Sequence, residues 1–281
     1  LYLILSKESK NPWEWLSEIV KCYSKLHHEV PCLRSHMELG IAMADLSAVS
    51  EPTLASTLIP RAKYHLLAVL KAEDADPALL KETELQFAKL YYYKSTIVDD
   101  PAKKVKNSEK CIQMLFKTLG KLDTKVKADL YISREAKMQI ALACGVKADA
   151  SAAILFKEPP ENAEALAAEV KRIDLIYEMQ VRLSQQVMDS AKLDVKWGTS
   201  ILEESRLCYC EAYYGQGAFR AEFPEFNMDY FAPCFKVLEF YESVVNDVKV
   251  SKGVKEAAKY YAEQVEALKA KLIGSEPVKK Q

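Results

Sequence analysis

Glycine is scarce in this sequence, with 8 among 281 residues, whereas globular proteins average about 7% glycine. Nucleotide-binding α/β folds need glycines in the loops that hold phosphate groups. Strand-like alternation of apolar and polar residues is also missing beyond stretches of a few residues. Together these absences argue against an α/β fold and favour an all-α one.

An excess of charge is missing too, because 39 basic side chains face 40 acidic ones and the formal net charge is −1. Bulk nucleic-acid binding is therefore not expected. Uninterrupted apolar runs stay below the roughly 18 to 20 residues that span a bilayer, so no membrane span is expected. The apolar opening, residues 1–5, is too short for a signal peptide.

Cysteine is neither absent nor clustered: 7 residues are scattered through apolar segments. An odd, dispersed set is unlike a disulfide framework and favours a reducing, intracellular compartment, cytoplasmic or nuclear. Cys208 and Cys210 project about 200° apart around a helix, so they are interpreted as packed thiols and not as ligands of one metal. Gly215 and Gly217 lack a third glycine and a preceding strand, so they are expected to end a helix.

Recognisable catalytic motifs are absent from the sequence, including serine nucleophile elbows, Walker loops and paired carboxylates. His27, His28 and His36 lie within ten residues, but adjacent helical positions face different directions. These histidines are interpreted as a solvent-facing cap region. The sequence thus predicts no catalytic residue, no cofactor and no metal site, and the chain is not expected to be an enzyme.

What the sequence does have is a series of helix-start signals. A capping residue followed by proline suits the first turn of a helix. Such pairs occur at Asn11-Pro12, Glu51-Pro52, Asp76-Pro77 and Asp100-Pro101, with further starts expected near residues 31–33 and 123. Helices therefore begin about every 20 to 25 residues. We expect one helical array over residues 1–274, with two halves joined by a long helix at about 162–194, and a disordered tail at 275–281.

Two segments resemble the tetratricopeptide (TPR)-like superfamily. In residues 36–46, Leu39-Gly40 and Met43 stand at positions of the first TPR helix; in residues 61–77, Ala62 and Leu66 stand at the small and large packing positions of the second. Roughly ten extra residues are expected between these helices. The resemblance implies a right-handed superhelical array of antiparallel helix pairs with a concave groove.

Residues 135–155 resemble a further, degenerate unit of the same superfamily. Ala141 and Ala153 have the spacing of the two small packing positions of a TPR. This segment is therefore expected to contribute to the same superhelix.

A basic region extends over residues 101–127, which hold eight lysines and two acidic residues. One interpretation is a solvated helix face; the other is a docking surface for an acidic partner segment, steered by charge and weakened by salt. The lysines proposed as partner contacts are Lys103, Lys104, Lys106, Lys110 and Lys117.

An aromatic segment extends over residues 219–235 around two prolines. It is interpreted either as a long connection pinned to the core by its own rings or as an exposed set of interface contacts. The proposed contacts are Phe223, Phe226, Tyr230 and Phe231.

These features predict a non-catalytic scaffold that binds an extended peptide or a partner helix in its concave surface. The first alternative is a structural subunit buried in a larger multiprotein assembly. The second is a helical small-molecule binder or enzyme with its pocket between helices.

Overall fold

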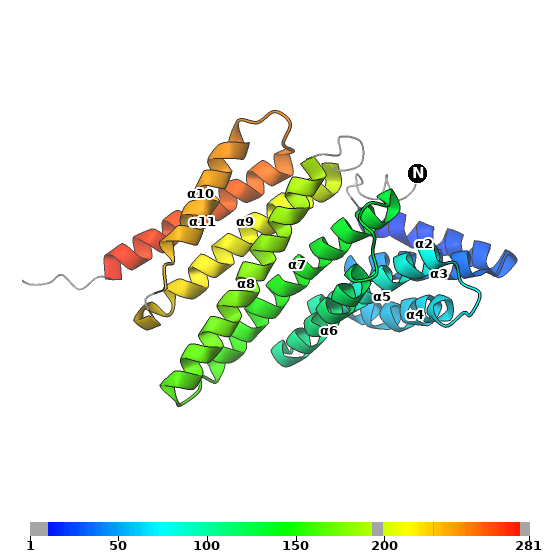
Figure 1. Ribbon diagram of the computed structural model, residues 1–281, viewed down its shortest axis with the longest axis horizontal. Helices are drawn as coiled ribbons and strands as arrows, with labels where there is room; N and C mark the ends of the chain where they lie inside the picture. The colour runs from blue at the N-terminus through cyan, green and yellow to red at the C-terminus, as the bar shows by residue number, and fades with distance from the viewer. Residues whose placement is uncertain (1–10, 193–198, 227, 276–281) are drawn as a thin grey trace, which may run out of the picture. The chain divides into compact units, whose positions relative to one another are not determined.

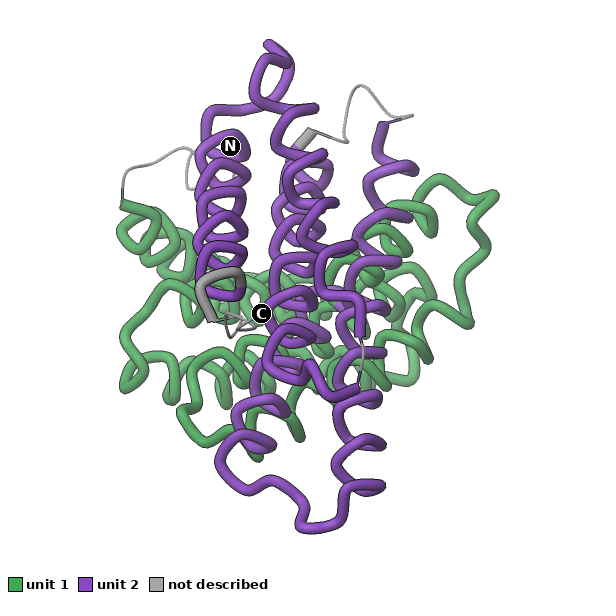
Figure 2. The backbone as a smooth tube through the Cα atoms, turned by 90° about the vertical axis from the view of Figure 1, so that its left-hand side faces the viewer, with its two compact units in different colours: residues 1–139 green, residues 140–281 purple. Residues whose placement is uncertain are grey.

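The computed structural model describes residues 11–192, 199–226 and 228–275. Within these ranges the chain is all-α, 85% helical and without strands. The chain divides into two compact units, residues 1–139 and residues 140–281, which Figure 2 colours separately. An all-α fold is thus confirmed.

Unit 1 is a succession of helices in which each helix packs on the next, from α2 to α6 (Figure 1). Their starts, and that of α7, lie 19 to 26 residues apart, close to the expected spacing. Side chains of Asp76 and Asp100 cap two helices by accepting backbone N–H groups, as the cap-plus-proline pattern predicted. The helices of unit 1 are α2 (Pro12–Glu29), α3 (Leu33–Ala48), α4 (Pro52–Leu70), α5 (Pro77–Ile97), α6 (Pro101–Leu119) and the first part of α7 (Lys127–Lys157).

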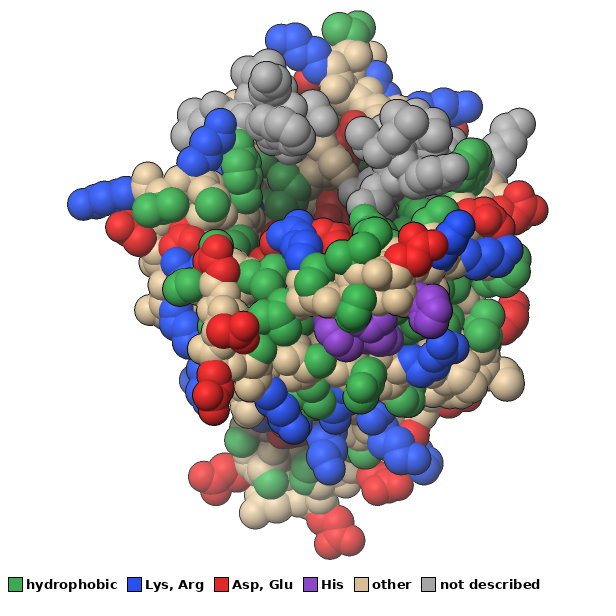
Figure 3. Space-filling model, turned by 90° about the vertical axis from the view of Figure 1, so that its right-hand side faces the viewer, with side chains coloured by type: hydrophobic (Ala, Val, Ile, Leu, Met, Phe, Trp, Pro, Cys, Tyr) green, Lys and Arg blue, Asp and Glu red, His purple; other side chains and the backbone are tan. Residues whose placement is uncertain are grey.

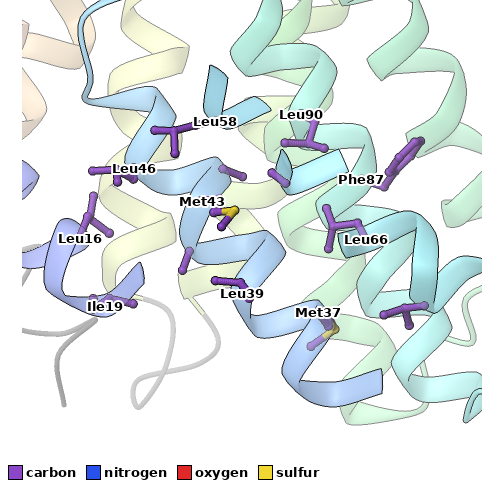
Figure 4. Close-up of a cluster of buried hydrophobic side chains, with 14 residues drawn as sticks. Leu16, Ile19, Met37, Leu39, Met43, Leu46, Leu58, Leu66, Phe87 and Leu90 are labelled. Atoms are coloured by element: carbon purple, nitrogen blue, oxygen red, sulfur yellow. The ribbon is translucent and has the colours of Figure 1, made fainter. Parts of the chain in front are cut away.

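The core of unit 1 brings together apolar side chains of α2, α3, α4 and α5, shown in Figure 4. At its centre α3 meets α4 at Gly40, where a Cβ would lie 2.9 Å from the Leu66 side chain and 3.2 Å from the Ala62 carbonyl oxygen. Ala62 and Leu66 are fully buried. The close approach of these two helices therefore depends on the small residue at position 40.

The extra residues expected between these two helices do not form a long connection. Because α4 begins at Pro52, only residues 49–51 separate it from α3. The additional residues form more than two further turns at the N-terminus of α4. This helix therefore begins at the Glu51-Pro52 pair, one of the expected helix starts.

The segment expected to form a further TPR-like unit, residues 135–155, is instead part of the single helix α7. Ala141 is buried, but Ala153 is exposed, so the two small residues do not play equivalent packing roles. The boundary between the two units falls inside α7, between residues 139 and 140. The long helix expected at 162–194 exists as α8 (Ala163–Lys192) and lies wholly within unit 2.

Unit 2 continues the pattern of sequential packing, with α8 on α9, α9 on α10 and α10 on α11. The apolar stripe along α11 is buried at Val254, Ala258 and Val265, which lie at spacings of four and seven residues and so share one face of the helix. Besides α8, the unit contains the end of α7, α9 (Thr199–Ala221), the short 3-10 helix η1 (Pro224–Phe226), α10 (Phe231–Val245) and α11 (Lys252–Ser275). The expected tail at 275–281 lies, beyond residue 275, outside the described residues.

The prediction that Gly215 and Gly217 end a helix is wrong, because α9 continues through both to Ala221. A Cβ at Gly215 would lie 2.9 Å from the Tyr177 ring, and one at Gly217 would lie 2.6 Å from the Cys234 sulfur. These glycines therefore allow neighbouring elements to approach α9 closely, and they do not serve as a stop signal.

The two cysteines of α9 are buried and face different neighbours. Cys208 lies 3.5 Å from the amide nitrogen of Gln180 in α8, whereas Cys210 packs in a cluster with Cys234 of α10. Burial raises the pKa of Cys208 to about 11 and that of Cys210 to about 12. Both thiols are protonated packing groups at neutral pH.

One helix in the described part of the chain, α7, is long and apolar enough to cross a membrane by length and composition alone. Its mean hydropathy reaches 1.4 over 18 residues, and 56% of that stretch is buried. A mostly buried core helix has the same composition, so α7 is only weak evidence for a membrane span.

Candidate partner-binding groove

Unit 1 carries an apolar groove between α4 and α5 with a volume of about 420 Å³. Ile59 of α4 and Leu90 of α5 are buried and form its apolar floor. The groove is lined by Ser56, Ile59, Pro60, Lys63, Leu90, Tyr91, Lys94, Ile97 and Val98. This volume lies within the range of about 300 to 1,000 Å³ that is typical of binding pockets.

Pro60 lies inside α4 and shapes the wall of the groove. A proline has no N–H, so the carbonyl of Ser56 receives no helical hydrogen bond from residue 60. Ser56 is exposed and also lines the groove. The proline therefore leaves one backbone carbonyl of α4 without its usual helical donor at a residue that borders the groove.

Positive charge flanks this apolar floor. Lys63 and Lys94 are exposed and line the groove, and no acidic side chain is found among its described lining residues. The Nζ of Lys110 in α6 lies 4.8 Å from the centre of the Tyr91 ring, a cation–π contact at the groove wall. The groove therefore combines apolar contact area with basic groups at its edge.

The predicted basic region only partly adjoins this groove. Lys103, Lys106, Lys110 and Lys117 are exposed and, at spacings of three, four and seven residues, share one face of α6. Lys104 is half-buried on a different face. Of the predicted lysine contacts, Lys110 touches the groove wall through Tyr91. The other four lie elsewhere on α6.

The structure divides the predicted aromatic contacts into buried and exposed rings. Phe223 is 7% exposed and stacks on Phe156 of α7, with ring centres 5.6 Å apart and an interplanar angle of 8°. Phe226 is half-buried, with its ring centre 6.2 Å from that of Phe223. The proposed partner contact at Phe223 is therefore corrected: its ring packs inside unit 2 and is not available at the surface.

The two remaining predicted rings lie at the start of α10. Tyr230 is half-buried and Phe231 is 48% exposed, with ring centres 4.2 Å apart. Phe235, one turn further along the helix, is 56% exposed. Phe231 and Phe235 thus form a small apolar surface on α10 in unit 2.

Unit 2 also holds a small polar cavity of about 170 Å³ between α7, α8, α9 and α11. Tyr177 donates a hydrogen bond of 2.7 Å to Asp149, and burial, together with the charge of Asp149, raises the pKa of Glu211. The side-chain oxygen of Gln180 has no hydrogen-bond partner among the described protein atoms. At roughly 30 Å³ per molecule, the cavity accommodates a few waters, one of which can serve Gln180.

Sequence reasoning missed the groove because its walls come from two helices with no shared motif. The one local signal was Pro60, a proline that lies between the helix start expected at Glu51-Pro52 and the TPR-like segment at residues 61–77. Tyr91, the first of three consecutive tyrosines in α5, forms part of the groove wall.

No protein-family model and no curated protein matches the chain in sequence. Among solved structures, the crystal structure of BtubC (BKLC) from P. vanneervenii is similar over 96% of this chain and 94% of that chain, with 14% identical residues and a TM-score of 0.33. That protein is helical as well. At these values the likeness is too distant to establish a shared fold or a function.

Proposed function

We propose that this chain is a non-catalytic protein-interaction scaffold. Its groove between α4 and α5 takes up a segment of a partner protein, either an extended peptide or a helix, that carries apolar residues flanked by acidic ones. The observation behind this proposal is the apolar floor at Ile59 and Leu90 edged by Lys63 and Lys94.

The two parts of the groove make different contributions to binding. Burial of one large apolar side chain against the floor contributes about 1.5 to 3 kcal/mol. The lysines attract an acidic segment and speed its association, an effect that salt weakens. A partner helix would use apolar side chains three or four residues apart, whereas an extended peptide would use alternate residues.

We also propose that the helix pairs continue into a right-handed TPR-like superhelix, with the groove on its concave surface. Sequential packing of the helices within each unit is consistent with such an array. So is the packing of Gly40 against Ala62 and Leu66, the positions through which paired TPR helices are expected to meet.

The proposal can be tested with a library of random peptides displayed on phage and selected against the whole chain. We expect enriched peptides to combine apolar residues with Asp or Glu and to bind more weakly at high salt. The double variant K63E/K94E should lose at least ten-fold in affinity, as measured by fluorescence anisotropy, because both edges of the groove change sign.

A charge-matched control is available in unit 2, where Lys249 and Lys252 are exposed. The variant K249E/K252E carries the same change in net charge and should bind the selected peptides as the wild type does. Equal affinities for the two double variants would rule out the groove as the binding site.

The single variants K110E and K117E separate the lysine at the groove wall from the distal part of α6. If the rest of the basic face is merely solvated, only K110E should weaken binding.

A second function, that of a subunit within a larger assembly, is favoured by the exposed pair Phe231 and Phe235 on α10. Exposed aromatic rings on a rigid helix are typical of interface contacts. If this surface is covered in an assembly, the isolated chain should self-associate, and F231S/F235S should reduce that association in sedimentation velocity experiments. A wild-type chain that stays monomeric at high concentration would argue against this function.

A further inference from the structure

Three histidines from three helices of unit 1 meet at one point. His27 belongs to α2, His36 to α3 and His65 to α4, and one ring nitrogen of each lies within 4.8 Å of those of the other two. Figure 3 shows histidine side chains gathered on one face of the molecule. The interpretation of the histidines as a solvent-facing cap region therefore holds for the exposed His28 but not for the half-buried His27 and His36.

The closest contact in the cluster joins His36 and His65, whose Nδ1 atoms are 3.0 Å apart. Nitrogens bound to one tetrahedral zinc ion at 2.0 to 2.1 Å are separated by about 3.3 Å. The two rings are thus within a few tenths of an ångström of the spacing that a shared ion requires. His27 is close as well, with its ring centre 4.1 Å from that of His36.

A hydrogen bond with Ser35 determines which ring nitrogen of His27 carries a hydrogen in the neutral form. The Ser35 hydroxyl lies 2.9 Å from the Cys32 carbonyl oxygen and 3.1 Å from that of Val30, which accept its single hydrogen. Ser35 Oγ therefore accepts, at 2.8 Å, the hydrogen on Nδ1 of His27. This tautomer leaves Nε2 of His27 with its lone pair, and histidine ligands of metals are commonly oriented by such a second hydrogen bond.

The three rings are half-buried, with Arg61 as a positively charged neighbour of His65. Metal ions bind the neutral form of imidazole, so zinc and protons compete for these nitrogens.

We propose that His27, His36 and His65 bind a single divalent transition-metal ion, with zinc as the expected ion and water as its fourth ligand. Imidazole nitrogens suit zinc among the common divalent metals, and three protein ligands with one open position form a known class of zinc site. The ion would join α2, α3 and α4, and because binding requires the folded arrangement it would stabilise the folded chain against unfolding.

Isothermal titration calorimetry with zinc chloride tests the site directly. The titrations use the full chain carrying C22S and C32S, because these two cysteines are exposed and could bind zinc themselves. Serine retains a side-chain acceptor at position 32, which caps α3. We expect one zinc ion per chain, and at least ten-fold weaker binding after H36A or H65A.

Two further variants sharpen the test. H28A removes an exposed neighbouring histidine outside the cluster and should leave zinc affinity unchanged. R61Q removes the positive charge that acts on His65 and should strengthen zinc binding. Circular dichroism of each variant checks that it is folded. Where H65A is not folded, R61Q is compared with H28A: stronger zinc binding in R61Q alone supports the site, and equal affinities contradict it.

Cobalt chloride supplies a spectroscopic readout of geometry. A cobalt ion held by three imidazoles and water in a tetrahedral site should give intense visible absorption bands, and these bands should disappear in H36A. Zinc affinity that is equal in folded H65A, H36A and H28A would overturn the proposal. So would the absence of zinc binding in the C22S/C32S chain.

Discussion

Asp174 of α8 accepts two hydrogen bonds from the guanidinium group of Arg220 in α9, at 2.7 Å from Nε and 2.9 Å from Nη2. Gln216 donates a third hydrogen bond to the same carboxylate, at 3.1 Å. Arg220 also donates to the carbonyl of Asp229, which lies in the connection to α10. One buried ion pair thus fixes both the packing of α9 on α8 and the course of the chain after α9.

Replacing Asp174 by alanine should destabilise the protein by about 3 kcal/mol, because the half-buried Arg220 would lose its bidentate partner and keep only Glu178, at 3.4 Å, as a counter-ion. The measurement is urea unfolding followed by circular dichroism. Asp189 provides the control: its ion pair with Lys192 is exposed, so D189A should cost less than about 1 kcal/mol. Similar losses for the two variants would show that the Arg220 pair is not buried in solution.

The close contact at Gly217 gives a second prediction. An alanine there would place a methyl group 2.6 Å from the Cys234 sulfur, so G217A should destabilise the chain by about 1 to 3 kcal/mol. Gly253 is a matched control, because its Cβ would meet nothing within 4 Å and alanine favours helix. We expect thermal unfolding to place G217A below the wild type and G253A at or above it. The opposite order would contradict the packing of α10 on α9.

Reactivity of the seven cysteines should follow their burial. Five are buried, including Cys111, whose pKa burial raises to about 12, and only Cys22 and Cys32 are exposed. A hydrogen bond from the Ser35 backbone N–H lowers the pKa of Cys32, so more of it is thiolate at neutral pH. In native protein, iodoacetamide should therefore modify two cysteines, as counted by mass spectrometry, and all seven in urea. Modification of a third cysteine without denaturant would show that part of the core opens readily.

The metal-free protein should lose stability as the pH falls from about 6.5 to about 4. Folding lowers the pKa of His65 from 6.5 to about 4, so in this range the unfolded chain binds a proton that the folded chain does not. His36 acts in the same direction, while His27 and Arg61 face the same cluster. As the pH is lowered, urea midpoints measured in the presence of EDTA should fall less in H65Q than in the wild type.

The control for this pH dependence is H28Q, which removes an exposed histidine and should follow the wild type. If H65Q and the wild type have the same pH profile, then His65 is not buried as a neutral ring. The sign of the effect distinguishes it from a salt-bridged histidine, which would add stability at low pH.

The helices of this fold were predictable because their signals are local. A cap such as Asp100 and a proline at the next position act on one helix end, whatever surrounds it. In α11, too, the three- and four-residue spacing of apolar side chains in the sequence matches the face that is buried. The lengths of the helices were harder to predict. Residues 135–155 belong to the continuous α7, but the spacing of Ala141 and Ala153 had indicated a repeat unit there.

The candidate sites were far less predictable, because they join residues distant in the chain. His65 follows His36 by 29 residues and meets it only once α3 and α4 are packed together. Gly217 looked like a helix end because glycine is common there, whereas its small size serves a contact with α10. Burial of Phe223 against Phe156 likewise depends on the tertiary structure and not on the aromatic composition of its segment.

The boundary between the compact units lies within the continuous helix α7, at Gln139 and Ile140, both buried. Cleavage there would leave carbonyl and N–H groups of α7 without their helical partners. Proteases therefore have easier targets in the connection at 120–126, which is largely exposed. Gene fragments that stop at residue 139 would end in mid-helix, so neither unit can be expressed in isolation with all its helices intact.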